Sequence, residues 1–409
     1  MQRDRASRSP GARTEELALH ARAFAARFGA RDGVRLFFSP GRVNLMGAHL
    51  DYNGGPVIPT AIDRGTFTAV RATAGRRLSI ASTLDASTLA IDLDDPPRAR
   101  TGRWYDYPLG VVLEMLDLLR RRGRPAPVGG LEILFGGNLP VGAGLSSSAS
   151  ICVGTACALD AAWELGLGRI DLVDAALRAE RGFVGVQCGI MDPYAVGLAR
   201  EGHLLWLDCK DATSAYIPLD PGRHLIAVAD TLVRRELAQG AFNERVRQCR
   251  AAFEALAPHA DGATCLRDVS LAVLEAHRDL LEPTIARRAE HVLREVARTF
   301  VARDALLRED TAGFGAEMVR AHESLRGLFD VSVPELDHLV ECAVACDGVL
   351  GSRLTGAGFG GCTVILLEVG AEDDLRARLV EGFERRFGRR PVVELYGGDA
   401  GPREIEGIA

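Results

Sequence analysis

The densest group of chemically capable side chains lies between glycines near the N-terminus. Residues 41–55 carry Arg42, His49 and Asp51 directly after the apolar run 34–38. A guanidinium, an imidazole and a carboxylate supply hydrogen-bond donors and acceptors at fixed spacing, and the glycines around them allow sharp turns. A simple chain reversal needs none of these side chains, so the segment indicates a functional site.

A second glycine-rich segment predicts a phosphate-binding loop. Residues 138–150 follow a predicted strand, open a predicted helix and contain three consecutive serines. Glycines let the backbone approach a ligand, and the free amides and dipole at a helix start attract anions. A helix cap alone would need fewer glycines and hydroxyls. The expected nucleotide-binding residues are Gly142, Gly144, Leu145, Ser146, Ser147 and Ser148.

The lysine content excludes two common ways of binding ATP. Lys210 is the only lysine, and every other basic side chain except histidine is arginine. The G-x-x-x-x-G-K-[ST] loop requires a lysine, and so does the strand of protein kinases that pairs with ATP phosphates. Lys210 has neither context. A nucleotide would therefore be held by backbone amides, magnesium and arginine.

Three motifs in order carry a family resemblance. Residues 41–55, the P-V-G-A-G-L-S-S-S-A run of residues 140–149 and the glycine-rich residues 354–362 resemble the signatures of galactokinases, in the GHMP family of small-molecule kinases. The resemblance covers roughly residues 14–395. It implies an α+β, two-domain GHMP kinase fold. The N-terminal domain would hold a mixed sheet and the phosphate-binding loop, the C-terminal domain would be an α/β sandwich, and the active site would lie in the cleft between them.

The resemblance also implies a reaction, the transfer of a phosphoryl group from ATP to the anomeric hydroxyl of a sugar with the help of Mg²⁺. Asp192 matches the catalytic aspartate, which would accept the anomeric proton. Arg42 matches the arginine that would keep this carboxylate ionised and stabilise the transferring charge. Glu180 matches the magnesium-binding glutamate, with Ser148 as the partner hydroxyl. One carboxylate and one hydroxyl suffice, because Mg²⁺ keeps substrate phosphates and waters as its other ligands.

The sugar site is assigned in the same way. His49 and Asp51 match the residues that bind sugar hydroxyls, and Gly189 matches a backbone contact. Trp104, in the weaker match Trp-Tyr-Asp-Tyr, is assigned to the nucleotide site.

Two positions depart from the galactokinase pattern and bear on the substrate. Galactokinases usually carry glutamate at the position of Ala48, where it bonds the C6 hydroxyl, and tyrosine at the position of Phe242. Loss of a carboxylate near C6 would let a substrate with its own C6 carboxylate enter. The sequence therefore favours D-galacturonic acid, with D-galactose as the alternative. Arg234 and Arg235 would either pair with the sugar carboxylate or be solvated. A non-catalytic sugar and ATP sensor is the alternative of another class, although the serine run is intact.

The elements that must position these residues can be placed from periodicity. The spacing of apolar residues predicts a mixture of helices and strands, and the sequence contains no internal repeat. The predicted helices are 15–28, 108–121, 147–165 and 172–183, with further charged helices between 234 and 343, and the predicted strands are 34–39, 67–71, 78–81, 131–135, 204–207, 225–229, 348–353 and 362–368. We expect a tail at 1–13, an N-terminal domain at 14–220 and a C-terminal domain at 221–409.

Length, net charge and composition indicate the number of domains, the class of partner and the location of the protein. The 409 residues favour two domains, and a net charge of −6 gives no reason to expect nucleic acid. We expect no membrane span, because no apolar run reaches about 18 residues. Nine dispersed cysteines suggest reduced thiols in a cytoplasmic protein. The expected partners are the sugar and ATP, with a monomer or a homodimer as the assembly.

Overall fold

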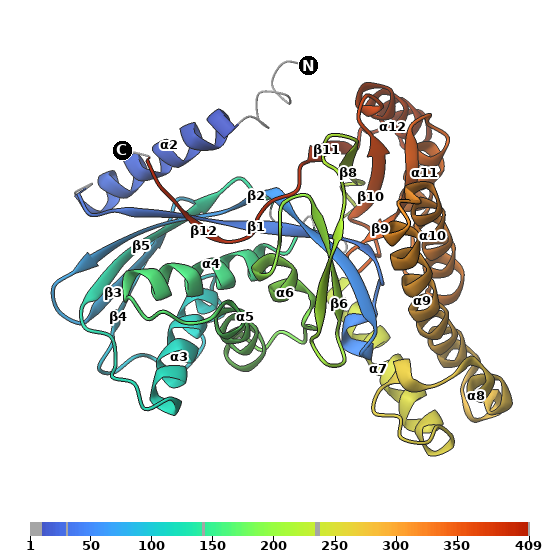
Figure 1. Ribbon diagram of the computed structural model, residues 1–409, viewed down its shortest axis with the longest axis horizontal. Coiled ribbons are helices and arrows are strands. Elements are labelled where there is room, and N and C mark those ends of the chain that lie inside the picture. The colour runs from blue at the N-terminus through green and yellow to red at the C-terminus, as the bar shows by residue number, and fades with distance from the viewer. Residues whose placement is uncertain (1–9, 30–31, 141–143, 234–237, 408–409) are drawn as a thin grey trace.

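The residues that the structure describes form two β-sheets, each with its own helices (Figure 1). A computed structural model describes residues 10–29, 32–140, 144–233 and 238–407. The larger sheet has the order β12-β1-β2-β5-β3-β4, and it is extended by β6, which pairs with β2, and by β7, which pairs with β6. Strands β3 and β5 run parallel, whereas the other neighbouring strands of this sheet are antiparallel. This sheet is therefore mixed, as predicted. Its strands are β1 (Arg35–Met46), β2 (Pro56–Thr73), β3 (Arg77–Ser82), β4 (Asp85–Asp92), β5 (Gly130–Gly137), β6 (His203–Asp208), β7 (Ser214–Pro218) and β12 (Arg403–Ile405).

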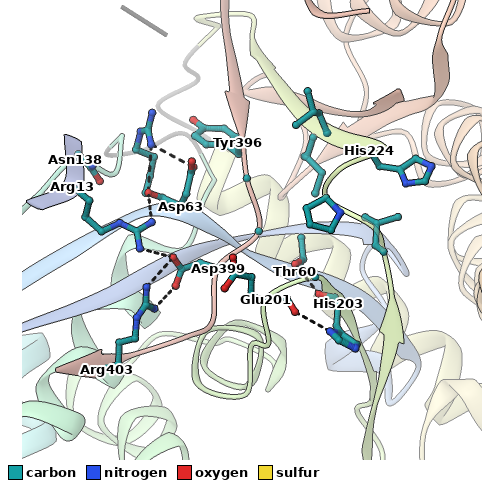
Figure 2. A pocket seen from close by; sticks show the side chains of 18 of the residues that line it. Arg13, Thr60, Asp63, Asn138, Glu201, His203, His224, Tyr396, Asp399 and Arg403 are labelled. Atoms are coloured by element: carbon teal, nitrogen blue, oxygen red, sulfur yellow. Dashed lines mark hydrogen bonds and ion pairs between the residues drawn. The ribbon is translucent and has the colours of Figure 1, made fainter. Parts of the chain in front are cut away.

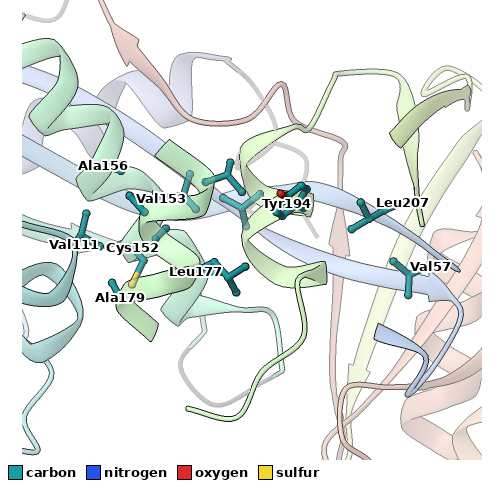
Figure 3. Close-up of a cluster of buried hydrophobic side chains, with 14 of the residues drawn as sticks. Val57, Val111, Cys152, Val153, Ala156, Leu177, Ala179, Tyr194 and Leu207 are labelled. Atoms are coloured by element: carbon teal, nitrogen blue, oxygen red, sulfur yellow. The ribbon is translucent and has the colours of Figure 1, made fainter. Parts of the chain in front are cut away.

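One face of the larger sheet is covered by a helical layer whose centre is apolar. Helix α4 (Ser147–Ala162) contacts β1 and β2, and its small side chains let the backbone approach the sheet. Figure 3 shows Cys152, Val153 and Ala156 of this helix among side chains of its neighbours. Helix α2 (Pro10–Phe28) lies across the opposite face (Figure 1). The other helices of this layer are α3 (Asp106–Arg121), α5 (Arg169–Arg178), the π-helical turn η2 (Ala179–Val184) and α6 (Met191–Gly197).

The smaller sheet has the order β11-β8-β10-β9, and all of its pairs are antiparallel. Apolar residues of two helices, α11 and α12, pack on one of its faces. Residues of α9 and α10 pack on the other face together with residues of β1 and β2, so the two sheets share a core. Its elements are β8 (His224–Asp230), β9 (Val349–Thr355), β10 (Cys362–Glu368), β11 (Val392–Tyr396), α7 (Ala238–Leu256), α8 (Leu271–Ala276), α9 (Pro283–Leu307), α10 (Thr311–Ser324), η6 (Leu325–Phe329), α11 (Pro334–Val344) and α12 (Glu372–Phe387).

The end of the chain returns from the smaller sheet to the larger one. Strand β12 pairs with β1, and the segment before it is fixed by Asp399, a residue that is 4% exposed. Asp399 pairs with Arg13 at 2.8 Å and with Arg403 at 2.6 Å, along the edge of a cavity of about 480 Å³ (Figure 2). Arg13 therefore belongs to the ordered helix α2, which begins at Pro10, whereas the sequence places 10–13 in a tail.

The predicted elements are present, and several extend further than predicted. Residues 42–46, which lie beyond the predicted strand 34–39, continue strand β1 through two register shifts against β2, between Pro40 and Arg42 and between Asn44 and Met46. Periodicity does not reveal these shifts, because an irregular pairing breaks the alternation of side chains. Strands β4, β7, β11 and β12 were not predicted. Within the described residues, no helix is long and apolar enough to cross a membrane.

Candidate active site

The predicted catalytic pair is in direct contact. Arg42 Nε donates to Asp192 Oδ1 over 2.7 Å, and Nη2 lies 2.6 Å from the same oxygen. Ser146 Oγ donates to Asp192 Oδ2 over 2.6 Å, so both carboxylate oxygens are engaged. The side chain of Arg42 is 7% exposed, and its Nη1 donates to the carbonyl of Gly144. The pair thus joins strand β1, the glycine–serine loop and helix α6.

His49 and Asp51 lie at the end of β1, where the chain turns sharply. Gly47 and His49 have φ of 84° and 60°, which is left-handed backbone. His49 Nδ1 lies 2.9 Å from Tyr52 Oη, and Nε2 has no hydrogen-bond partner within the described residues. Burial lowers the pKa of His49 to about 3, so the imidazole is neutral. A neutral imidazole can donate or accept a hydrogen bond with a sugar hydroxyl.

Gly189 and Asp51 are in close contact. A Cβ added to Gly189 would lie 1.9 Å from Oδ2 of Asp51, so only glycine fits opposite this carboxylate. Burial raises the pKa of Asp51 to about 6, and the charge of Asp192 acts in the same direction. The structure therefore brings together the side chain and the backbone segment to which the sequence assigns sugar binding.

These residues surround a cavity of about 200 Å³ between the two sheets. Phe242 of α7 forms part of its wall, with its ring 5.9 Å from that of His49 and 5.6 Å from that of Tyr52. Ala48, which is 4% exposed, lines the cavity as well. Arg234 and Arg235, considered as partners of a sugar carboxylate, lie outside the described residues.

A second, larger cavity adjoins the start of α4. It measures about 670 Å³ and is lined by Trp104, Tyr107, Ser147 and Ser148. Trp104 Nε1 donates to Asp85 over 2.9 Å, which fixes the orientation of the indole. An aromatic wall beside hydroxyls at a helix N-terminus suits a base and its phosphates.

The other residues of the glycine–serine loop have distinct positions. Gly142 lies in 141–143, outside the described residues. Gly144 comes close to Gly356 of the third motif, since a Cβ on Gly144 would lie 4.0 Å from the Cα of Gly356. Leu145 is 2% exposed and packs into the core shared by the two sheets, and its carbonyl accepts from the Arg42 amide. Leu145 thus anchors the loop with its side chain.

Glu180 is suited to bind a cation. It lies in the π-helical turn η2, is 2% exposed, and its Oε2 has no hydrogen-bond partner within the described residues. Burial raises its pKa to about 7, partly offset by a hydrogen bond from Ser148. A buried carboxylate of this kind is costly without a positive partner. A divalent cation held by Glu180 and Ser148 would supply that partner, so the residues fit Mg²⁺.

Residues 47–51, which carry His49 and Asp51, form the sugar loop. Sequence reasoning missed two charged residues that lie behind this loop. Arg353 of β9 is fully buried and lines the smaller cavity, and Glu295 of α9 is fully buried nearby. An arginine within an apolar strand is the signal that could have identified Arg353. Glu295 lies among many charged residues of a helix, so no local pattern distinguishes it.

Comparison with known proteins decides the family. The galactokinase galactose-binding signature matches residues 22–72, and the N- and C-terminal domains of GHMP kinases match residues 110–200 and 302–386. A galactokinase from Bacillus subtilis is 36% identical over 387 residues, which cover 94% of this chain and 98% of that protein. The chain belongs to the galactokinase family of GHMP kinases.

Further comparisons agree with this membership. A galactokinase of Roseiflexus sp. is 40% identical over 358 residues, covering 87% of this chain and 89% of that protein. The crystal structure of Lactococcus lactis galactokinase in complex with galactose matches with a TM-score of 0.88 and 31% identity, over 95% of this chain and 100% of that one. The predicted two-domain fold and the prediction of a sugar kinase are thus confirmed.

Proposed function

We propose that this kinase transfers the γ-phosphoryl group of ATP to the C1 hydroxyl of D-galactose, giving galactose 1-phosphate and ADP. The contact between Arg42 and Asp192 carries the proposal. Both residues line the smaller cavity, and Asp192 is bonded to Ser146, directly before the serines of the larger cavity. A base and a cation between a sugar site and a nucleotide site are what in-line phosphoryl transfer requires.

The comparisons favour galactose over galacturonate, although the sequence favoured galacturonate because of Ala48. The relatives described above carry the name galactokinase, and the N-terminal match is to a galactose-binding signature. The cavity is lined by two carboxylates, Asp51 and Asp192, and by two guanidiniums, Arg42 and Arg353. Arg42 is paired with Asp192, and Arg353 donates to backbone carbonyls, so both guanidiniums already have partners other than a sugar carboxylate.

Each residue has a part in the proposed reaction. Asp192 accepts the proton of the C1 hydroxyl as the new bond to phosphorus forms. Arg42 keeps Asp192 ionised and stabilises the charge on the transferring group. His49 and Asp51 orient the sugar hydroxyls, and the aromatic wall at Trp104 receives the base. Mg²⁺, bound by Glu180 and Ser148, would neutralise charge on the phosphates.

A panel assay tests the proposal. ADP release is measured with galactose, galacturonate, glucuronate, arabinose and N-acetylgalactosamine at equal concentration, with and without Mg²⁺. We expect galactose to give the highest kcat/KM and the activity to require Mg²⁺. A higher kcat/KM with galacturonate would refute the choice of sugar. Normal binding of galactose and ATP without any ADP release would instead support the non-catalytic sensor.

A further inference from the structure

The loop that carries His49 is held from the other half of the molecule by a buried carboxylate. Oε1 of Glu295, on α9, accepts from the backbone amides of Gly47 and Ala48, both at 3.3 Å. Glu295 is fully buried and forms an ion pair with Arg298. A carboxylate this far from water is costly to bury, so each bond that it makes matters.

A cation from the smaller sheet binds the last residues of strand β1, which lead into this loop. Arg353 Nε donates to the carbonyl of Leu45 over 2.5 Å, and Nη2 donates to that of Asn44 over 2.6 Å. Burial lowers the pKa of Arg353 to about 10, and the charge of Glu295 opposes this shift. Two opposite charges from the C-terminal half therefore bind four backbone groups here, the carbonyls of residues 44 and 45 and the amides of residues 47 and 48.

The bonds from Glu295 and Arg353 lie directly beside a residue whose backbone conformation is unfavourable. His49 has φ of 60°, and a residue with a Cβ adopts this conformation only when its surroundings impose it. The amides bound by Glu295 belong to the two residues that immediately precede His49. Glu295 thus fixes the direction in which the chain enters the turn, and with it the position of the imidazole in the sugar cavity.

We propose that Glu295 is a positioning residue for the sugar site. It contacts no substrate and acts through the backbone of Gly47 and Ala48, so its removal weakens sugar binding without changing nucleotide binding. The proposal rests on the function proposed above, because it assumes that the cavity at His49 receives the sugar. Because Glu295 lies on α9, the affinity for sugar would depend on how α9 packs against the larger sheet.

The test compares Glu295→Gln with Glu317→Gln. Glu317, on α10, approaches the same Arg298 at 3.9 Å and pairs with Arg320, so its substitution disturbs the same arginine without touching the loop. We expect Glu295→Gln to raise the KM for galactose about tenfold, because the two amides then face a neutral amide oxygen in place of a carboxylate. Its kcat and its KM for ATP should stay within about threefold of wild type, as should all constants of Glu317→Gln.

Several outcomes would overturn the proposal. One is an unchanged KM for galactose in folded Glu295→Gln, and another is an equal rise in the KM for ATP. If Glu295→Gln fails to fold, Glu295→Asp keeps the charge for Arg298 and shortens the reach to the amides. An unchanged KM for galactose in that variant would be equally decisive. Wild-type protein that neither binds nor phosphorylates galactose would refute the proposed function itself, and the positioning role would fall with it.

Discussion

Substitution of Gly189 by alanine should damage the sugar site selectively. The new Cβ would lie 1.9 Å from Oδ2 and 2.4 Å from Cγ of Asp51, whereas real Cβ contacts are essentially never below 3.0 Å. Either Asp51 or the backbone at 189 must therefore move by about 1 Å. A misplacement of that size in a binding site can cost on the order of 100-fold in rate. We expect kcat/KM for galactose to fall by about this factor, mainly through KM.

The assay is ADP release with galactose and ATP varied in turn, together with thermal unfolding. The matched control is Gly327→Ala, because a Cβ there would meet nothing within 4 Å. The KM for ATP should stay within about twofold of wild type in both variants, since neither touches the larger cavity. A KM for galactose in Gly189→Ala close to that of the control would refute the reasoning that Asp51 and Gly189 form one rigid wall of the sugar site.

Three further predictions address the base, the metal and the nucleotide. Asp192→Asn should lower kcat by about 100-fold or more while the Kd for ATP stays near that of wild type, and unchanged turnover would remove Asp192 as the base. Because the pKa of Glu180 is raised to about 7, its protonation should weaken Mg²⁺ binding as pH falls below 7, by up to about tenfold per pH unit. The raised pKa also means that metal-free protein gains stability from this group as pH falls from 7 toward its unfolded value of 4.5. Mg²⁺ titrations and unfolding at pH 6 and 8 measure both effects, which Glu180→Gln should abolish. Trp104→Ala should raise the KM for ATP about tenfold without changing the KM for galactose, and a change confined to galactose would contradict the assignment of the larger cavity.

Short-range motifs explain why the sequence was informative about the family. Residues 41–55 and 138–150 each carry their donors, acceptors and glycines within one turn or one helix start, so spacing along the chain reflects spacing in the site. The comparisons confirm the fold and the sugar kinase activity inferred from them. The residue roles stay predictions, as do the division into domains, the cytoplasmic location and the assembly as monomer or homodimer.

The choice of substrate is the point on which the motif taken alone and the comparisons differ. Ala48 removes a carboxylate from the sugar loop, and taken alone that loss favours a negatively charged sugar. The folded chain places Glu295 immediately behind this loop, bonded to the amide of Ala48 itself. The sequence separation of 247 residues hides this neighbour from any reading of the motif.

The sequence by itself determined the family, the order of the motifs and the residue types that the reaction requires, because these depend on local spacing and chemical identity. Only the tertiary structure decided how they meet. The contact between Arg42 and Asp192 spans 150 residues, and that between Arg353 and Asn44 spans 309. Such contacts depend on register, on irregular pairing in β1 and on the packing of two sheets around one core. None of these is encoded by the residues on either side of a motif.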